Sequence, residues 1–288
     1  MVSTHDQSDA TPIGQLLDWG ARLLASSSAS PRLDAEVLMA DLVCWPRSTV
    51  MAFPGRTLPQ GMTDEFRGLI RRREEGTPLA HLTGRREFYS LDLRVSAETL
   101  VPRPETELLV DQLLERVRPI EAVSILDLGT GSGAIALAIK RQRPDARVVA
   151  VDWSAAALSV AIDNGNRLKI QVEWLLSDFG FEALEGRLFD FIVANPPYVE
   201  RGDPRLVSGD LRHEPRMALD GGVDGLDSIR EIIAGAPRVL APGGTLLLEH
   251  GYDQAPAVAR SFRALGFRRI ETYKDLAGQD RTTVGTGP

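Results

Sequence analysis

The sequence has very little cysteine and no long apolar run. Cys44 is the only cysteine among 288 residues. It can form no intramolecular disulfide and no multi-cysteine metal site, so nothing in the chain requires an oxidising compartment. We expect Cys44 to be a small buried apolar residue, and we expect no bound metal. No apolar segment approaches the roughly 20 residues of a membrane span, and the polar N-terminus carries no secretory signal. These absences predict a cytoplasmic protein without a membrane partner.

An excess of basic charge is also absent. The 33 Lys and Arg residues are outnumbered by 40 Asp and Glu residues, which gives a net charge of −7. The field of the whole chain therefore does not favour nucleic acid, although a local basic face is compatible with this balance. Hydrophobic residues at 43% and charged residues at 25% are ordinary for a globular protein. The length allows one large or two ordinary domains.

The spacing of apolar residues changes along the chain and predicts its division into domains. Helical spacing dominates the first quarter, an extended hairpin pattern and a stiff Val101–Pro104 linker follow, and strands and helices then alternate. We expect four segments: a disordered N-terminus (1–10), a helical domain (11–76), a β-hairpin and linker (77–104), and one α/β domain (105–288).

The alternation after residue 122 predicts an α/β fold with a parallel sheet. A long irregular stretch, 200–226, interrupts it, and loops of this length usually have a function. Strands are expected at 123–128, 147–151, 171–176, 189–194, 245–249, 268–272 and 282–284, and helices at 105–117, 134–143, 155–167, 228–240 and 255–265.

The most informative stretch is an apolar run that ends in Asn195-Pro196-Pro197-Tyr198. The preceding residues, 191–194, are all apolar and are interpreted as a buried parallel strand. The prolines end this strand because they have no N–H for the ladder, and they restrict the backbone around them. Asn195 and Tyr198 are therefore expected at the carboxyl edge of the sheet, where ligands bind in open α/β folds.

A glycine-rich loop follows the strand that ends near Leu128. It reads Gly129-Thr130-Gly131-Ser132-Gly133. The first two glycines let the backbone approach a ligand, and the third permits tight helix–strand packing. The next strand ends at Asp152, whose carboxylate can accept two hydrogen bonds from a ribose diol. Together they predict an adenosyl-cofactor site, with a packing turn as the alternative.

Acidic and aromatic residues around the loop narrow the choice of cofactor. Asp127 is predicted to face the amino-acid end of the ligand. Asp178 is predicted either to bind an adenine amino group or to cap a helix, and Phe179 to stack on the adenine ring. No Walker pattern is present, which disfavours a triphosphate. S-adenosylmethionine is a sulfonium cation without phosphate and suits an acid-flanked loop better than NAD, its strongest rival.

The Asn-Pro-Pro-Tyr corner suits methyl transfer to a planar NH2 nitrogen. Such a nitrogen is a weak nucleophile because its lone pair is delocalised, and it must be aligned at ~3 Å from the methyl carbon. The Asn195 side-chain oxygen and the Pro196 carbonyl can accept its two N–H groups and stabilise the developing positive charge. Tyr198 offers a flat face for stacking. A proline-rich turn without chemistry is the alternative.

Longer motifs identify a family. Together with the glycine loop, Asp152 and Asn-Pro-Pro-Tyr, these motifs make the chain resemble the peptide chain release factor glutamine N5-methyltransferase family (PrmC/HemK). The resemblance extends from about residue 12 to the C-terminus. The resemblance is carried by Thr83-Gly84-x-x-Glu87-Phe88-Tyr89, Leu100-Val101-Pro102-Arg103-Pro104-Glu105-Thr106-Glu107, Glu214-Pro215-x-x-Ala218-Leu219-x-Gly221-Gly222-x-Asp224-Gly225 and Lys274-Asp275-Leu276-Ala277-Gly278-x-Asp280-Arg281.

The resemblance implies a fold, a reaction and a set of site residues. The fold is a class I S-adenosylmethionine-dependent methyltransferase, Rossmann-like, with a seven-stranded doubly wound sheet and a reversed last strand. The expected reaction is methylation of the glutamine in the Gly-Gly-Gln motif of bacterial release factors 1 and 2 by a monomer that binds no nucleic acid directly. Asn195, Pro196 and Tyr198 are the expected catalytic residues; Asn195 to Tyr198 bind substrate; and Asp127, Gly129 to Gly133, Asp152, Asp178, Phe179 and Asn195 bind the cofactor.

Two rival functions stay open from the residues. One is an adenine-N6 methyltransferase acting on DNA or RNA, which the acidic balance disfavours. The other is a non-catalytic cofactor-binding module that docks on another protein, which the intact Asn195 and Tyr198 disfavour. The roles of Arg103, Glu105 and His250 are undetermined, and we favour structural ones.

Overall fold

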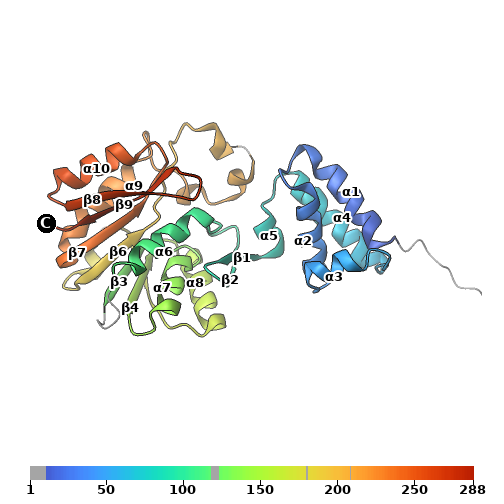
Figure 1. The fold of residues 1–288 in the computed structure, drawn as a ribbon, viewed down its shortest axis with the longest axis horizontal. Coiled ribbons are helices and arrows are strands. Elements are labelled where there is room, and N and C mark those ends of the chain that lie inside the picture. Colours follow the sequence, from blue (N-terminus) through green and yellow to red (C-terminus); the bar gives the residue numbers. More distant parts are fainter. Residues whose placement is uncertain (1–10, 118–122, 180, 208) are drawn as a thin grey trace, which may run out of the picture. The chain divides into compact units, whose positions relative to one another are not determined.

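The chain folds as two compact units, Met1–Gly84 and Arg85–Pro288 (Figure 1). The structure is a computed structural model that describes residues 11–117, 123–179, 181–207 and 209–288. The predicted disorder of residues 1–10 therefore lies outside the described residues. No helix in these described ranges combines the length and the apolar character needed to cross a bilayer.

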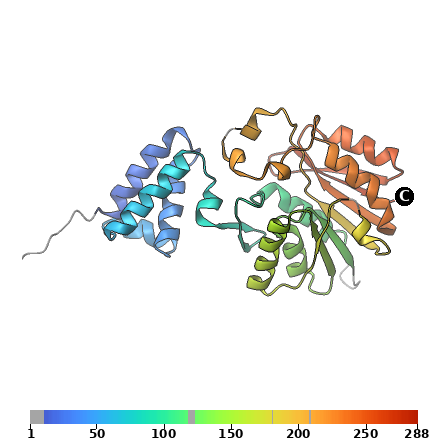
Figure 2. The same cartoon turned by 180° about the vertical axis from the view of Figure 1, so that it is seen from behind.

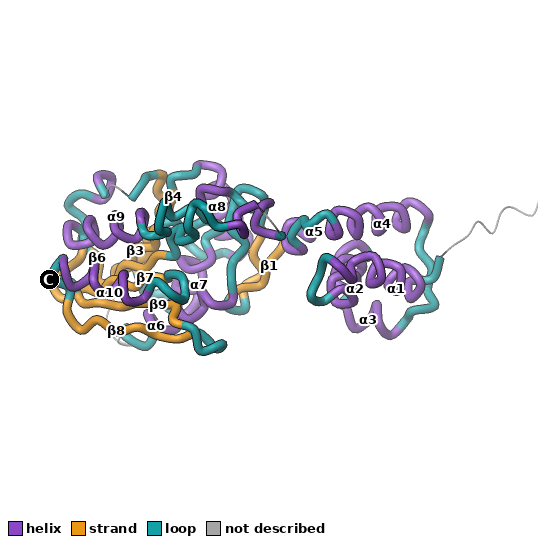
Figure 3. The backbone as a smooth tube through the Cα atoms, turned by 90° about the horizontal axis from the view of Figure 1, so that it is seen from above, coloured by secondary structure: helices purple, strands orange, loops and turns teal. Residues whose placement is uncertain are grey.

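The first unit is helical, as its apolar spacing predicts. Its buried core consists of side chains three and four positions apart, such as Ile13, Leu16 and Leu17, facing Phe66 and Ile70. The unit includes a helix beyond residue 76, where we expected the domain to end. The helices, purple in Figure 3, are α1 (Ile13–Leu23), α2 (Pro31–Leu42), α3 (Arg47–Ala52), α4 (Gln60–Glu74) and α5 (Leu79–Thr83).

The expectation of a buried Cys44 is wrong. Cys44 is exposed, with a backbone φ of 54°, in the turn that follows α2. The helix that places Leu38 and Met39 in the core has already ended at Leu42. Cys44 therefore lies outside the core, although its neighbours in the sequence are apolar.

The second unit contains the expected seven-stranded sheet. The strand order is β5-β4-β3-β6-β7-β9-β8, and β9 is antiparallel to both of its neighbours. This confirms a doubly wound sheet whose last strand in the chain is reversed. The strands are β3 (Ser124–Leu128), β4 (Arg147–Asp152), β5 (Glu173–Leu176), β6 (Phe189–Ala194), β7 (Leu240–Glu249), β8 (Arg268–Lys274) and β9 (Asp280–Thr286).

Helices cover both faces of this sheet (Figure 2). Alternate residues of β3 show the two layers, because Ile125 packs with α6 and α7 whereas Leu126 packs in the core that contains α9 and α10. Near-continuous apolar strands are typical of such doubly covered sheets. The helices are α6 (Glu107–Leu114), α7 (Ala134–Gln142), α8 (Ala155–Leu168), α9 (Asp227–Gly235) and α10 (Ala255–Ala264).

One strand begins earlier than the sequence predicts. We expected a helix up to Leu240 and a strand from Thr245, but β7 begins at Leu240, which pairs with Phe189. The ladder shifts register before Thr245 pairs with Phe191. Gly243, at a φ of 77°, lies in this irregular stretch, where a side chain would be strained. The strand therefore continues through an irregularity of the ladder.

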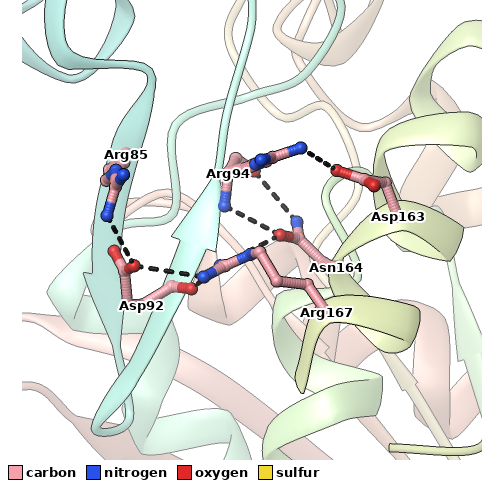
Figure 4. A network of polar contacts seen from close by, with 6 residues as sticks. All are labelled: Arg85, Asp92, Arg94, Asp163, Asn164 and Arg167. Atoms are coloured by element: carbon pink, nitrogen blue, oxygen red, sulfur yellow. Dashed lines mark hydrogen bonds and ion pairs between the residues drawn. The ribbon is translucent and has the colours of Figure 1, made fainter. Parts of the chain in front are cut away.

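The hairpin is anchored on α8. It consists of β1 (Arg85–Phe88) and β2 (Leu91–Arg94). The side-chain oxygen of Asn164 accepts the Arg94 N–H at 2.8 Å, and its amide nitrogen donates to the Arg94 carbonyl at 2.9 Å. The same nitrogen donates to the Ser132 carbonyl of the glycine loop at 3.0 Å. Ion pairs among Arg85, Asp92, Arg94, Asp163 and Arg167 surround this contact (Figure 4).

Candidate active site

The predicted motifs meet at one edge of the sheet. Strands β3, β4 and β6 are parallel neighbours, so their carboxyl ends lie side by side. The glycine loop leaves β3, Asp152 is the last residue of β4, and Asn195 follows β6. Three segments that lie up to 66 positions apart therefore converge, since 195 − 129 = 66.

The glycine loop has the conformation that its sequence predicts. Gly129 and Thr130 both donate their N–H to the Val151 carbonyl at 2.9 Å, which holds the loop on β4. Gly131 has a φ of 57° and faces open space, so a ligand can approach its backbone. A Cβ on Gly133 would lie 3.2 Å from Ala161, so this glycine permits close packing of α7 and α8.

Asp152 forms the wall of the site beside this loop. Its carboxylate accepts the N–H of Gly131 at 2.8 Å and the N–H of Ser154 at 2.9 Å. Burial raises the pKa of Asp152, and these backbone donors oppose that rise. Each oxygen retains one lone pair, so the carboxylate is held rigidly and can still accept hydrogen bonds from a diol.

Asp127 lies behind the loop and not among the residues that line the cavity. One of its oxygens accepts the Thr130 hydroxyl at 2.6 Å and the Ala136 N–H of α7 at 3.1 Å. Its other oxygen has no hydrogen-bond partner among the described residues. Complete burial raises the pKa of Asp127 to about 7. These contacts make Asp127 a brace between β3, the loop and α7.

A cavity of about 770 Å³, including its opening to solvent, lies over the glycine loop. Phe179 lines it and stacks against Trp153, with ring centroids 6.0 Å apart and planes at 25°. Asp178 is exposed and does not line it. The predicted residues in the lining are Gly129, Thr130, Gly131, Ser132, Asp152, Phe179, Asn195 and Pro197.

Several lining residues were not predicted from the sequence. Trp153 follows Asp152 directly, so its position beside the strand-end acid could have revealed it. Most of the others come from the linker before α6 and from the irregular 200–226 stretch, where several belong to the family motifs but were given no role at the site. They are Glu98, Thr99, Leu100, Pro102, Thr106, Pro215, Met217 and Ala218.

Asn195 lies between this cavity and a second one, and lines both. Its amide nitrogen donates to the Thr106 hydroxyl at 3.0 Å. Its side-chain oxygen is buried and has no hydrogen-bond partner among the described residues. A buried acceptor without a partner is costly for a fold, and this one suits a ligand that brings an N–H group.

The rest of the corner is fixed from behind. The Tyr198 hydroxyl donates to Glu249 at 3.1 Å, and the Tyr198 carbonyl accepts from the Gln254 amide at 2.9 Å. Burial raises the pKa of Tyr198, so its hydroxyl is a neutral donor. A Cβ on Gly221 would lie 2.7 Å from the Pro197 carbonyl, so the 200–226 stretch packs directly on the corner. Pro196 and Tyr198 line the second cavity.

The three residues left undetermined now have defined surroundings. Arg103 forms an ion pair with Glu214, whose carboxylate also accepts the Val101 N–H at 2.9 Å, and it lines the second cavity. His250 is buried, and its ring nitrogens contact the Gly251 carbonyl and the Thr283 hydroxyl, both at 2.8 Å. These contacts agree with structural roles. Glu105 lies in the 3₁₀ turn Pro104–Thr106 before α6.

The chemistry of the first cavity fits an adenosyl sulfonium ligand. It offers a rigid carboxylate for a diol, aromatic rings for a base, and an open glycine backbone, all on a doubly wound sheet. None of the described residues that line it is a lysine or an arginine that could bind a phosphate. Fold and site together define a class I S-adenosyl-L-methionine-dependent methyltransferase.

Comparisons with known proteins identify the family. The family model described as the PrmC N-terminal domain matches residues 15–84, and the methyltransferase small domain matches residues 104–213. A release factor glutamine methyltransferase of Salmonella typhimurium is 46% identical over 90% of this chain and 93% of its own. The Escherichia coli K12 protein of the same name is 44% identical over the same shares. The chain belongs to the release factor glutamine methyltransferase family.

Solved structures show the same fold at lower identity. A methyltransferase from Pyrococcus furiosus is 17% identical, with a TM-score of 0.54 over 78% of this chain and all of that one. A 16S rRNA methyltransferase from Thermus thermophilus is 23% identical, with a TM-score of 0.50 over 71% of this chain and 50% of that one. The expected fold class is confirmed.

Proposed function

We propose that this protein transfers a methyl group from S-adenosyl-L-methionine to the side-chain nitrogen N5 of the glutamine in the Gly-Gly-Gln motif of class 1 peptide chain release factors. Membership of the family supports the reaction. The observation that carries it to this site is the side-chain oxygen of Asn195, which is buried, unpartnered among the described residues and located between two cavities.

The first cavity is proposed to hold the cofactor. Asp152 accepts hydrogen bonds from the ribose hydroxyls. The main chain of the loop from Gly129 to Gly133 lies along the ligand, and Phe179 and Trp153 contact the adenine. Asp178, which directly precedes the lining residue Phe179, is proposed to reach the adenine amino group, and Asp127 to act by bracing the loop. When bound, the cofactor supplies a methyl group that is activated by its attachment to a sulfonium.

The second cavity is proposed to hold the substrate amide. Asn195 Oδ1 and the Pro196 carbonyl accept the two amide N–H groups and stabilise the positive charge that develops on nitrogen. Tyr198 provides the flat surface for the amide plane, and Pro197 keeps the corner stiff. Because the acceptors need no proton of their own, no ionised base is required beside the cation. One N–H proton leaves after the N–C bond has formed.

The partners are proposed to be release factors 1 and 2, which the helical unit 11–84 and the hairpin help to dock. We propose a cytoplasmic monomer that binds neither nucleic acid nor membrane. The net charge of −7 supports the absence of a nucleic-acid partner.

The test is transfer of a labelled methyl group. The protein is incubated with methyl-labelled S-adenosyl-L-methionine and either a release factor or nucleic acid, and the modified residue is located by mass spectrometry. We expect label on the Gly-Gly-Gln glutamine. Asn195→Ala should lower the rate by about 10²- to 10³-fold, as expected for loss of one charge-stabilising contact.

Asn166→Ala is the matched control, because Asn166 is an exposed residue of α8 outside both cavities. It should leave transfer unchanged. Label in nucleic acid but not in protein would contradict the proposed substrate. Cofactor binding without any transfer would indicate a docking module.

A further inference from the structure

A buried carboxylate lies behind the Asn-Pro-Pro-Tyr corner, at the end of β7. Glu249 is completely buried. Its Oε1 accepts the Tyr198 hydroxyl at 3.1 Å, and its Oε2 has no hydrogen-bond partner among the described residues. Burial of a carboxylate costs free energy unless hydrogen bonds and charges around it compensate.

Thr106 connects this carboxylate to Asn195. The Thr106 hydroxyl accepts the Asn195 amide N–H at 3.0 Å and interacts with the Glu249 carboxylate, stabilising its charged form. A hydroxyl has a single proton to donate. If that proton is directed at Glu249, the hydroxyl can only accept from Asn195, which must then present its nitrogen to Thr106.

From this geometry we propose that Glu249 is a positioning residue, which acts through Thr106 and Tyr198 to turn the Asn195 side-chain oxygen toward the substrate amide and to fix the Tyr198 ring. The proposal rests on the proposed glutamine methylation. In the proposed order, Asn195 donates to Thr106, Thr106 directs its proton to Glu249 as Tyr198 does, and only the oxygen of Asn195 is left for the substrate.

The charge of Glu249 decides how strictly this order holds. An ionised carboxyl only accepts, whereas a protonated one can donate to Thr106 and free that hydroxyl to turn. Burial raises the pKa of Glu249 to about 7, and the Thr106 and Tyr198 hydroxyls oppose the rise. The charged groups that face it are Arg281 of β9, which lowers this pKa, and Glu105 before α6, which raises it. Transfer should therefore weaken as the pH falls below about 7.

The experiment compares four variants in steady-state methylation of a release factor. Glu249→Gln keeps the shape and one acceptor but adds donors. Thr106→Val removes the link, and Tyr198→Phe removes only the hydroxyl. Tyr273→Phe is the control, because its hydroxyl contacts Arg116 and Glu271 of the same unit outside both cavities. Thr106→Val should lower kcat by about 10- to 100-fold, as for a misplaced reacting group, with cofactor affinity unchanged by calorimetry.

Three further results separate positioning from mere folding. Glu249→Gln should flatten the acidic limb of the pH–kcat profile. Thr106→Val should cost less in the Glu249→Gln background than in the wild type, because the two residues act in one chain. Without any substrate, the NMR signals of the Asn195 side-chain amide should shift in Thr106→Val and Glu249→Gln but not in Tyr273→Phe.

A kcat for Thr106→Val within about twofold of wild type would overturn the proposal, and so would additive losses in the double variant. An Asn195 amide signal unchanged by both substitutions would overturn it as well. Failure of the wild-type protein to label a release factor would instead overturn the proposed function, and the NMR measurement would still decide the role of Glu249.

Discussion

Two buried carboxylates support the two halves of the site, and they differ in how the chain holds them. Asp127 lies behind the glycine loop and Glu249 behind the Asn-Pro-Pro-Tyr corner; both are fully buried, and burial raises the pKa of each to about 7. The partners of Asp127, Thr130 and Ala136, lie within nine positions. The closest partner of Glu249 in the sequence, Tyr198, lies 51 positions away.

The difference shows why one half of such a site is self-contained and the other depends on assembly of the whole domain. The brace at Asp127 joins only β3, the glycine loop and α7. The support behind Asn195 requires β6, β7 and the segment before α6 to be in place together. Changes at Asp127 should therefore affect stability and cofactor binding, and changes at Glu249 should affect turnover.

The largest expected effect is that of Asp127→Ala. The substitution leaves the Thr130 hydroxyl and the Ala136 N–H buried without their acceptor, which costs roughly 1–3 kcal/mol for each group. We expect the free energy of unfolding to fall by that order and cofactor affinity to fall with it, while kcat at saturating cofactor is kept. Chemical denaturation and calorimetry measure both quantities. A variant with unchanged stability and unchanged cofactor affinity would contradict the bracing role of Asp127.

Asp152→Ala should have a more selective effect. The carboxylate lost is at the cavity wall and not behind the loop, so cofactor binding should weaken by about 1–3 kcal/mol, as for lost charged hydrogen bonds. Asp145→Ala is the control, because Asp145 is an exposed residue paired with Arg143. Equal calorimetric affinities in the wild type and Asp152→Ala would contradict the ribose assignment.

Asp127 and Glu249 should give the protein the same kind of pH dependence. Their folded pKa values, about 7, lie above the ordinary 3.8 and 4.5. The folded state thus binds more protons between about pH 4 and pH 7, and its stability falls as the pH rises through that interval. Asp127→Asn and Glu249→Gln should each lose less stability than the wild type between pH 5 and pH 8. These two pH values enclose the upper part of the interval in which the folded state binds the extra protons.

Asp224→Asn tests the sign of this effect. Its contact with Arg230 lowers the pKa of Asp224, so its contribution is present above the ordinary pKa and is lost only as the pH falls. Between pH 5 and pH 8 this variant should follow the wild type. Denaturant titrations at the two pH values compare all four proteins, and a parallel response of Asp127→Asn and wild type would contradict the linkage.

Effects on stability alone should appear at the hairpin, and the smallest of all at its exposed ion pair. Asn164→Leu removes a buried amide that bonds both backbone groups of Arg94, so we expect a loss of roughly 1–3 kcal/mol of unfolding free energy. Arg85→Ala removes one exposed ion pair with Asp92 and should cost less than ~1 kcal/mol. Thermal unfolding ranks the two, and a reversed order would contradict the assigned anchor.

The contiguous motifs are the ones that the sequence singles out and that the structure brings together at the sheet edge. The glycine loop, Asp152 and Asn195–Tyr198 each combine a strand end with its own turn chemistry, so a local pattern is enough. The family resemblance added the reversed last strand, which alternation alone does not give. Neither source revealed Thr106 or Glu249 as neighbours of Asn195, because their proximity exists only in the folded sheet.

Two predicted site residues do not line the first cavity, for physical reasons. Asp127 shares its face of β3 with Ile125, because strand side chains alternate, and this face packs against α7 and not the cavity. Asp178 is exposed, while the next residue, Phe179, turns into the lining. Spacing along the chain located both acids near the sheet edge but did not give the direction of their side chains.

The contact between Asn164 and the hairpin has a consequence for protein engineering. Asn164 bonds the main chain of Arg94 and the main chain of Ser132, and neither of their side chains. A hairpin of different sequence can therefore be grafted here if its backbone follows the same path and it keeps Phe88, Leu91 and Leu93, which are buried in the core, whereas a shift of one residue would disconnect it from the loop beneath. The exposed hairpin side chains are thus open to redesign, with Asn164 kept as the fixed joint.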